Sequence, residues 1–297
     1  MKLATTTCDF FGYTSNQIEI IEYISNAGFK NIDYAFGIDY RRNSGIFSDD
    51  LKGYTYNLKS KADELGVKFV QAHAPMGAPL DNDADFIEAN LRCIDFCNEL
   101  GIKNIVVHSG YREGLTKEQT FNENKRFFEK LLPRAEKYGI NILVENFNKM
   151  GDKIYWIDNA HDLLQMVECV NHPLFNAVWD TGHGNQQPLP PHESLKILGK
   201  YVKALHVQDN MGDLDSHLAP FFGNQNLDSL MHGLIDIGYN GYFTFEADNM
   251  LLPAVRRKVF NDDNRLLEPP LSLRIEAEKF LYQIGKAILS AYDCFEE

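Results

Sequence analysis

The chain has 297 residues, and 29 Lys and Arg residues against 42 Asp and Glu residues give it a formal net charge of −13. Hydrophobic residues make up 44% and charged residues 24%, which is an ordinary globular composition. This composition excludes a disordered chain, a collagen-like repeat and a small disulfide scaffold. The length suits a single α/β barrel, a fold that commonly runs to about 250 residues.

The acidic balance disfavours nucleic acid as a partner, because proteins that grip duplex DNA usually carry a basic stripe that neutralises phosphates. The five cysteines form no CxxC pair, which argues against a zinc site built on Cys. No apolar run approaches the ~18 residues of a membrane span, and the polar N-terminus lacks a secretory signal core. We therefore expect a cytoplasmic protein with no membrane partner.

Eight short β-rich runs alternate with longer amphipathic segments along the chain. Most runs are apolar at nearly every residue, as in NIVVH and NILVE, which is typical of strands buried on both faces of a parallel sheet. The expected strands are Leu3–Cys8, Asn31–Ala35, Lys68–His73, Asn104–His108, Asn141–Glu145, Phe175–Asp180, Val202–Val207 and Gly241–Glu246.

Helices are expected between these strands, with the clearest patterns over Asn16–Asn26 and Asp83–Leu100. Four residues are predicted to be helix N-caps: Ser15, Asp83, Thr116 and Asp158. Eight strand–helix repeats without a break in composition predict one (β/α)8 TIM barrel over residues 1–297. A doubly wound open sheet is the alternative, but no GxGxxG follows the first strand.

Six consecutive strands each end on His, Asp or Glu. These residues are His73, His108, Glu145, Asp180 with His183 shortly after it, His206 and Glu246. In a TIM barrel the carboxyl ends of all strands open onto one face, where active sites lie. Acids converging at that face would repel one another, and their burial would be costly, unless a cation lay between them. The pattern therefore predicts a divalent metal site.

A second polar cluster follows the seventh strand, in the segment HVQDNMGDLDSH. It contains Asp209, Asp213, Asp215 and His217. One interpretation is an acidic, solvated loop. The other is that Asp215 and His217 fold back onto the same face as two more ligands. The spacing leaves both interpretations open.

The order AHAP, VVHSG, LVENF, WDTGH, LHVQDN with a following DxH, and FEAD resembles the xylose isomerase-like TIM barrels over nearly the whole chain. This superfamily joins sugar isomerases and epimerases with endonuclease IV. Resemblance to the sugar branch implies one divalent ion (Mn, Zn, Co or Mg) held by Glu145, Asp180, His206 and Glu246. It also implies that the catalytic residues are the two glutamates, which move a proton beside the sugar carbonyl.

Resemblance to the endonuclease IV branch implies three zinc ions instead. The additional ligands would then be His73, His108, His183, Asp215 and His217, which could otherwise contact the substrate. All positions carry suitable residue types, so ligand identity does not separate one ion from three. We expect one.

Two departures from the sugar branch concern the substrate. The segment Pro220–Asp228 has one glycine where a glycine-rich turn is common, and residues 207–217 contain no Arg or Lys. Nothing therefore supports a phosphorylated substrate. Lys149, Lys153 and Arg112 are the nearest basic residues on the same face and are interpreted as solvated surface charges.

The favoured function is a metal-dependent isomerase or epimerase of a small, uncharged and non-phosphorylated sugar. His183, His108 and Trp179 are the expected substrate contacts, and Phe36, Phe147 and Trp156 could also stack on a sugar. One alternative is a multinuclear zinc hydrolase or lyase, either a phosphodiesterase or a sugar-cleaving enzyme. A non-catalytic binding protein is another. A homo-oligomer is compatible with this class, but no feature identifies a contact face.

Overall fold

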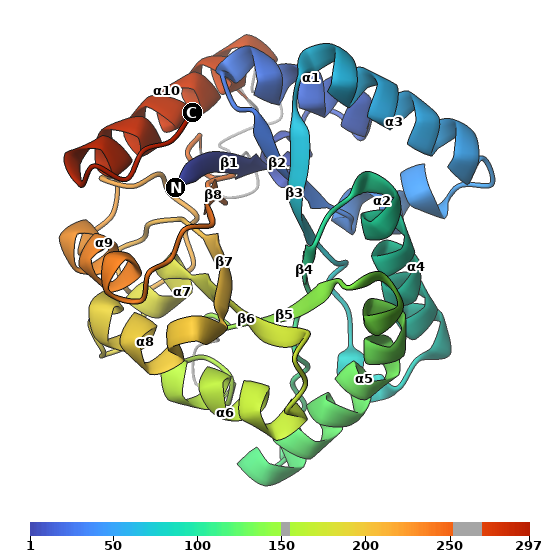
Figure 1. Ribbon diagram of the computed structural model, residues 1–297, viewed down its shortest axis with the longest axis vertical. Helices are drawn as coiled ribbons and strands as arrows, with labels where there is room; N and C mark the ends of the chain where they lie inside the picture. Colours follow the sequence, from blue (N-terminus) through green and yellow to red (C-terminus); the bar gives the residue numbers. More distant parts are fainter. Residues whose placement is uncertain (150–154, 252–268) are drawn as a thin grey trace, which may run out of the picture.

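The computed structural model describes residues 1–149, 155–251 and 269–297. Lys153 and most of the connection after the eighth expected strand lie outside the described residues. Eight parallel strands form a ring enclosed by helices (Figure 1). The predicted (β/α)8 barrel is confirmed.

The eight strands follow one another around the ring in chain order. They are β1 Lys2–Thr6, β2 Asn31–Ala35, β3 Lys68–His73, β4 Asn104–Val106, β5 Asn141–Glu145, β6 Phe175–Asp180, β7 Val202–His206 and β8 Tyr242–Phe245. Four strands have the predicted bounds, and the others end earlier or are shorter than predicted. For example, β1 ends early because Thr7–Phe10 forms a 3-10 helix.

The ring closes where β8 meets both β1 and the end of β7. Residues of β1 pair in parallel with β8 from Lys2 to Thr5. On the other side, the Val207 N–H donates to the Thr244 carbonyl at 2.7 Å, and the Glu246 N–H donates to the Val207 carbonyl at 3.1 Å. The backbone of Glu246 is thereby fixed beside the end of β7.

Ten α-helices lie in the described residues. They are α1 Gln17–Ala27, α2 Gly37–Arg42, α3 Leu51–Leu65, α4 Ala84–Leu100, α5 Lys117–Tyr138, α6 Ala160–Val170, α7 Thr181–Asn185, α8 Pro191–Leu198, α9 Leu227–Asp236 and α10 Leu271–Ala291. The last helix lies beside α1, so the two ends of the chain meet on one side of the barrel (Figure 1). Across the described ranges, no helix is both long and apolar enough to cross a membrane.

Two of the four predicted N-caps are confirmed, Asp83 and Thr116. The other two are wrong by one position, because asparagine side chains next to them accept the first free helix N–H groups. Asn16 caps α1 in place of Ser15, and Asn159 caps α6 in place of Asp158.

Candidate metal centre

The barrel interior has an apolar layer directly below the predicted ligands. Four neighbouring strands contribute to this layer, with Val106, Leu143, Val178 and Ala204, each at most 2% exposed. Two positions further along the chain stand His108, Glu145, Asp180 and His206. Residues i and i+2 of a strand share a face, so the polar layer follows from the strand period of two. The expected ligands of β5, β6 and β7 therefore point into the barrel.

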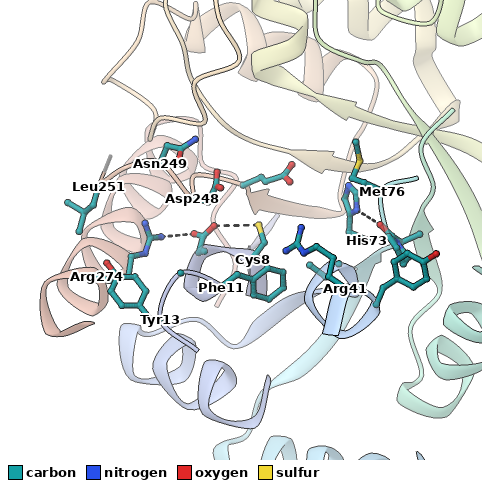
Figure 2. A pocket seen from close by; sticks show the side chains of 18 residues that line it. Cys8, Phe11, Tyr13, Arg41, His73, Met76, Asp248, Asn249, Leu251 and Arg274 are labelled. Carbon is teal, nitrogen blue, oxygen red and sulfur yellow. Dashed lines mark hydrogen bonds and ion pairs between the residues drawn. The ribbon is translucent and has the colours of Figure 1, made fainter. Parts of the chain in front are cut away.

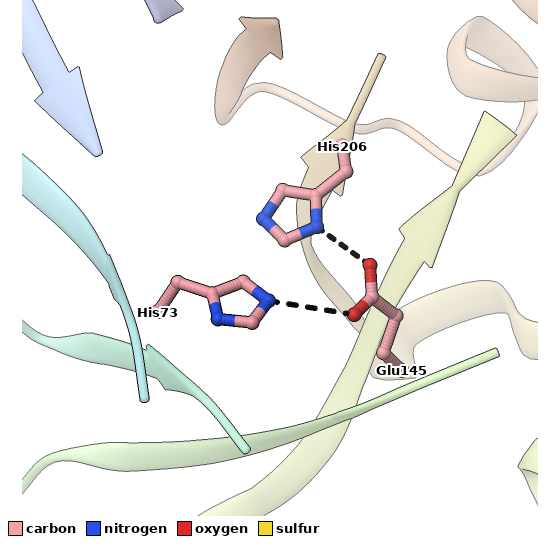
Figure 3. Close-up of side chains that lie close together, drawn as sticks. All are labelled: His73, Glu145 and His206. Atoms are coloured by element: carbon pink, nitrogen blue, oxygen red, sulfur yellow. Dashed lines mark hydrogen bonds and ion pairs between the residues drawn. The ribbon is translucent and has the colours of Figure 1, made fainter. Parts of the chain in front are cut away.

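Glu145 and His206 form the centre of this polar layer (Figure 3). Glu145 Oε1 lies 2.6 Å from His206 Nδ1, and both side chains are only 1% exposed. Glu246 Oε2 lies 3.1 Å from the same nitrogen. On its other side, Glu145 Oε2 faces His73 Nε2 at 3.7 Å and His108 Nε2 at 3.4 Å. One imidazole nitrogen therefore stands between two glutamates.

The charges at this point are strongly coupled. Burial disfavours a charged imidazole, but Glu246 and Glu145 outweigh it and raise the pKa of His206 well above its ordinary value. Burial opposes ionisation of Glu145, but His206 and the other nearby histidines lower the pKa of that carboxyl well below its usual range. The glutamates thus hold a positive charge between them, which is the environment that a metal cation needs.

Asp180 supplies another carboxylate with unmet bonding capacity. Its Oδ1 accepts the His183 N–H at 2.7 Å. Its Oδ2 is buried without a hydrogen-bond partner, and so is Glu145 Oε2. Burial raises the pKa of Asp180 to about 7, with His183 opposing this shift and Glu145 reinforcing it. Buried oxygens without partners are costly, and a bound cation would satisfy both.

The four ligands implied by the sugar branch fit a single ion. Ligand atoms of Glu145, Asp180, His206 and Glu246 all lie within 4.8 Å of one another. Two ligands on opposite sides of an ion with bonds of about 2.2 Å would be about 4.4 Å apart, so small adjustments suffice. Three carboxylates and one imidazole form an oxygen-rich set, which suits manganese or magnesium.

Two residues behind His206 were missed by the sequence analysis, Asp33 and Gln71. His206 Nε2 lies 3.2 Å from Asp33 Oδ2, which also accepts the Gln71 amide at 2.9 Å. A histidine that binds metal through one nitrogen commonly donates the other N–H to a carboxylate, which fixes the ring. The available signal was a polar residue with apolar neighbours on both sides inside each of two strands, β2 and β3.

A second group of potential ligands lies beside the first. His183, Asp215 and His217 also have ligand atoms within 4.8 Å of one another. Asp215 Oδ2 lies 3.4 Å from His183 Nε2 and 3.2 Å from His217 Nε2. His217 has a φ of 48°, a left-handed conformation that a non-glycine residue rarely adopts. The loop after β7 thus turns back and places Asp215 and His217 beside the first group, as the second of the two interpretations describes.

The acids around Asp215 have other environments. Asp213 is exposed. Asp209 is 1% exposed, and its Oδ2 accepts the N–H groups of Phe221 and Gly223 at 3.1 and 3.0 Å. Its carboxylate therefore shapes the loop in which a single glycine replaces the family's glycine-rich turn.

The aromatic residues expected at the substrate divide into two sets. Trp179 is 1% exposed and lies in the core beneath α7, where a Cβ added at Gly184 would come close to its ring. Phe36 is fully buried as well. Phe147 is half-buried instead, and its ring centroid lies 5.5 Å from that of His108 and 5.9 Å from that of His183.

Two of the basic residues expected as solvated charges are described. Lys149 is exposed. Arg112 pairs with Asp81 at 3.1 Å, and its side chain is 45% exposed. Neither bears on the metal centre.

Fold and ligand geometry together define the class: a (β/α)8 barrel with a candidate divalent-metal centre at the carboxyl ends of its strands. Residues 21–268 match the family described as xylose isomerase-like TIM barrel. The chain belongs to this family, as the sequence motifs indicated.

Curated relatives match parts of the chain. The chain is 28% identical over 177 residues to "Uncharacterized protein MJ1311" of Methanocaldococcus jannaschii. The matched region covers 58% of this chain and 59% of that protein. The chain is 30% identical over 122 residues to fructoselysine 3-epimerase of Escherichia coli O157:H7, covering 41% of this chain and 44% of that protein. The matches thus span about half of each relative.

Among solved structures, a D-tagatose 3-epimerase-like protein has a TM-score of 0.75 at 20% sequence identity. The similarity covers 98% of this chain and 100% of that chain. At 20% sequence identity, this similarity shows that the two proteins share a fold.

Proposed function

We propose that this protein is a metal-dependent sugar isomerase or epimerase in which Glu145 and Glu246 move a proton beside the sugar carbonyl. The observation that carries the proposal is the approach of both glutamates to one nitrogen, His206 Nδ1, at 2.6 and 3.1 Å. They reach this point from β5 and from the residue that follows β8. The similarity to fructoselysine 3-epimerase supports a sugar as the substrate.

The residues present fit a divalent ion, which would be held by Glu145, Asp180, His206 and Glu246. When bound, such an ion would withdraw charge from the sugar's carbonyl oxygen and so make the neighbouring C–H more acidic. One glutamate then removes that proton, and the other gives a proton back, to the same carbon in an epimerisation or to the neighbouring carbon in an isomerisation. A positioned base of this kind typically contributes about 10²–10⁴-fold to the rate.

Glu145 can serve both as ligand and as base because its two oxygens differ. Oε1 lies at His206, whereas Oε2 makes no hydrogen bond and faces the rings of His73 and His108 at 3.7 and 3.4 Å. One oxygen can therefore face the ion while the other accepts a proton. Glu246 is 16% exposed at the mouth of the barrel, where it can meet a substrate.

His108 and His183 are proposed to contact sugar hydroxyls. Burial lowers the pKa of His108 to about 3, and neighbouring histidines add to this against the opposing effect of Glu145. A neutral ring at this position can hydrogen-bond a hydroxyl without adding charge. Burial opposes a charged His183, but Asp180 and Asp215 raise the pKa of this residue to about 10. His183 would then act as a donor.

A multinuclear zinc hydrolase or lyase is the second candidate, favoured by the grouping of His183, Asp215 and His217. In this group Asp215 already accepts side-chain N–H groups from Asn148 at 2.8 Å and from Gln208 at 2.7 Å. Among the candidate ligands, the buried carboxylate oxygens without a hydrogen-bond partner are Glu145 Oε2 and Asp180 Oδ2, which belong to the four-residue set, so we favour one ion. Elemental analysis of protein purified without chelator separates the two: about one ion per chain supports the epimerase, and about three zinc ions support the hydrolase.

The proton roles can be tested by hydrogen exchange in D₂O. Wild-type protein with Mn²⁺ is mixed with a panel of free ketoses, and NMR follows the loss of the hydrogen beside the carbonyl. Glu145→Gln and Glu246→Gln should each abolish this exchange. Glu276→Gln is the matched control, because Glu276 is an exposed residue of α10 that pairs with Lys279 at 2.7 Å and belongs to none of the candidate ligand groups. Exchange that persists in a Glu145 or Glu246 variant with measured bound metal would remove the role of that residue.

A further inference from the structure

A cavity of about 480 Å³ opens beside the metal centre, and His73 and Glu246 are among its lining residues. Figure 2 shows His73 at one end and Arg274 with Leu251 at the other, with Arg41 between them. Cavities of about 300–1,000 Å³ commonly hold drug-sized ligands. The cavity therefore has room for a substituent beyond the sugar carbons that reach the metal centre.

Arg41 brings an uncompensated positive charge to this cavity. It lies in the last turn of α2, and its guanidinium points into the cavity (Figure 2). Among the described residues, no carboxylate pairs with it and no hydrogen bond engages it. Arg41 and its neighbour Arg42 are both exposed, but only Arg41 lines the cavity.

Arg274 adds donors at the far end. Its side chain is 1% exposed, and its Nη2 donates to Asp9 at 2.7 Å and to Glu278 at 2.5 Å. Its Nε and Nη1 are buried without a partner. Unmet donors on a buried guanidinium are costly, and an acceptor in the cavity would satisfy them.

Guanidinium groups recognise carboxylates and phosphates. The same cavity is also lined by two acids, Asp9 and Asp248. Asp9 is paired with Arg274, and Asp248 lies 3.1 Å from His217 Nδ1. A doubly charged phosphate would be repelled by both acids, whereas a singly charged carboxylate meets about half of that repulsion.

We propose that the substrate is a ketose carrying a carboxylate, which Arg41 binds in the cavity that Arg274 lines at the far end. This inference rests on the proposed function and narrows its substrate class. It replaces the expectation of an uncharged sugar. That expectation rested on the basic residues that lie nearest to the predicted ligands in the sequence. The cavity takes its arginines from α2 and α10 instead.

Three matched ligands test this proposal by titration calorimetry: D-fructose, D-fructuronate, in which a carboxylate replaces the terminal hydroxymethyl group, and D-fructose 6-phosphate. Each is titrated into wild-type protein, Arg41→Gln and the control Arg42→Gln. Every titration is run with bound Mn²⁺ and again after metal removal, because a carboxylate could bind the ion directly. In the metal-free titrations binding is measured without turnover, so that result does not depend on catalysis.

We expect fructuronate to bind wild-type protein and the Arg42 variant about 10-fold to 100-fold more tightly than fructose, with or without metal, as a charge-assisted hydrogen bond would provide. Arg41→Gln should remove this difference and leave fructose binding unchanged. Equal binding of the two sugars to wild-type protein, or a difference that survives Arg41→Gln, would overturn the proposal. Tighter binding of the 6-phosphate that depends on Arg41 would overturn the carboxylate assignment.

The failure of this proposal and the failure of the proposed function have different signatures. If no ketose in the wider panel shows hydrogen exchange, the epimerase proposal fails whatever the calorimetry shows. If fructose exchanges its hydrogen and fructuronate gains nothing in binding, the epimerase stands and the carboxylate site does not.

Discussion

Replacing Asp180 with asparagine should make the metal-free protein more stable and remove most of the stabilisation by a divalent ion. The Asp180 side chain is completely buried, and its Oδ2 has no hydrogen-bond partner. Burial raises its pKa to about 7, helped by Glu145 and opposed by His183. The folded protein therefore binds this proton more tightly than the unfolded chain does. Stability is lost as the pH rises from about 4 to about 7, and the loss persists above that pH.

The size of the effect follows from the pKa. A rise from about 3.8 to about 7 corresponds to at most about 4 kcal/mol at pH 8. The Asp180→Asn variant keeps an acceptor for the His183 N–H but carries no charge there, so it should recover much of this energy in chelator. Wild-type protein with metal at 100 times its Kd should gain about 2.7 kcal/mol. The variant, with three ligands left, should gain far less.

The assay is urea unfolding of both proteins at pH 8, in EDTA and with Mn²⁺. A repeat in EDTA at pH 4 is the control, because Asp180 is then protonated in the folded protein and the two proteins should have nearly equal stability. The reasoning is refuted if the variant is less stable than wild type in EDTA at pH 8. It is also refuted if Mn²⁺ stabilises both proteins equally.

Three further substitutions test other parts of the structure. Asp33→Asn should weaken metal binding about 10–100-fold, because it removes the carboxylate that orients His206; calorimetric titration with Mn²⁺ would show it, and unchanged affinity would contradict the role. Gly184→Ala should cost about 1–3 kcal/mol in urea unfolding, because the new methyl group meets Trp179; wild-type stability would mean that α7 shifts freely. Arg274→Met should cost about 3–5 kcal/mol, since two buried carboxylates lose their partner, and a loss under about 1 kcal/mol would contradict this.

Much of the fold could be predicted because its strands are buried on both faces. Runs such as Asn141–Glu145 are apolar at nearly every residue, and their bounds were predicted correctly. The ends were less predictable where the chain turns without a glycine or proline. Thr7–Phe10 continues a strand-like composition but wraps into a 3-10 helix, which the composition does not indicate.

The candidate ligands were predictable because each stands at the end of a strand, where the fold brings them together. Trp179 was misplaced although the strand period of two already opposed it. Its neighbour Asp180 points into the barrel, so the indole must point outward to the helices. Asp33 lies in the middle of its strand, so a search of the strand ends did not identify it as a candidate residue.

The cavity arginines were not predictable, because their neighbours come from distant parts of the sequence. Arg274 meets Asp9 across 265 residues of sequence, and this contact exists only once the barrel has closed. Arg41 lies in a six-residue helix that no hydrophobic period marks. Local patterns therefore predicted the metal ligands but not the groups proposed to select the substrate.

The hydrogen bond from the Glu246 N–H to the Val207 carbonyl helps to close the barrel between the ends of β7 and β8. We call this contact the β7–β8 joint. His206 and Glu246, two of the candidate ligands, stand on opposite sides of this joint. An ion shared by them would clamp the wall of the barrel as well as assist chemistry. Chelation should then loosen this joint before any other, and the amides of Val207 and Glu246 should be the strand-end protons whose exchange with solvent accelerates most.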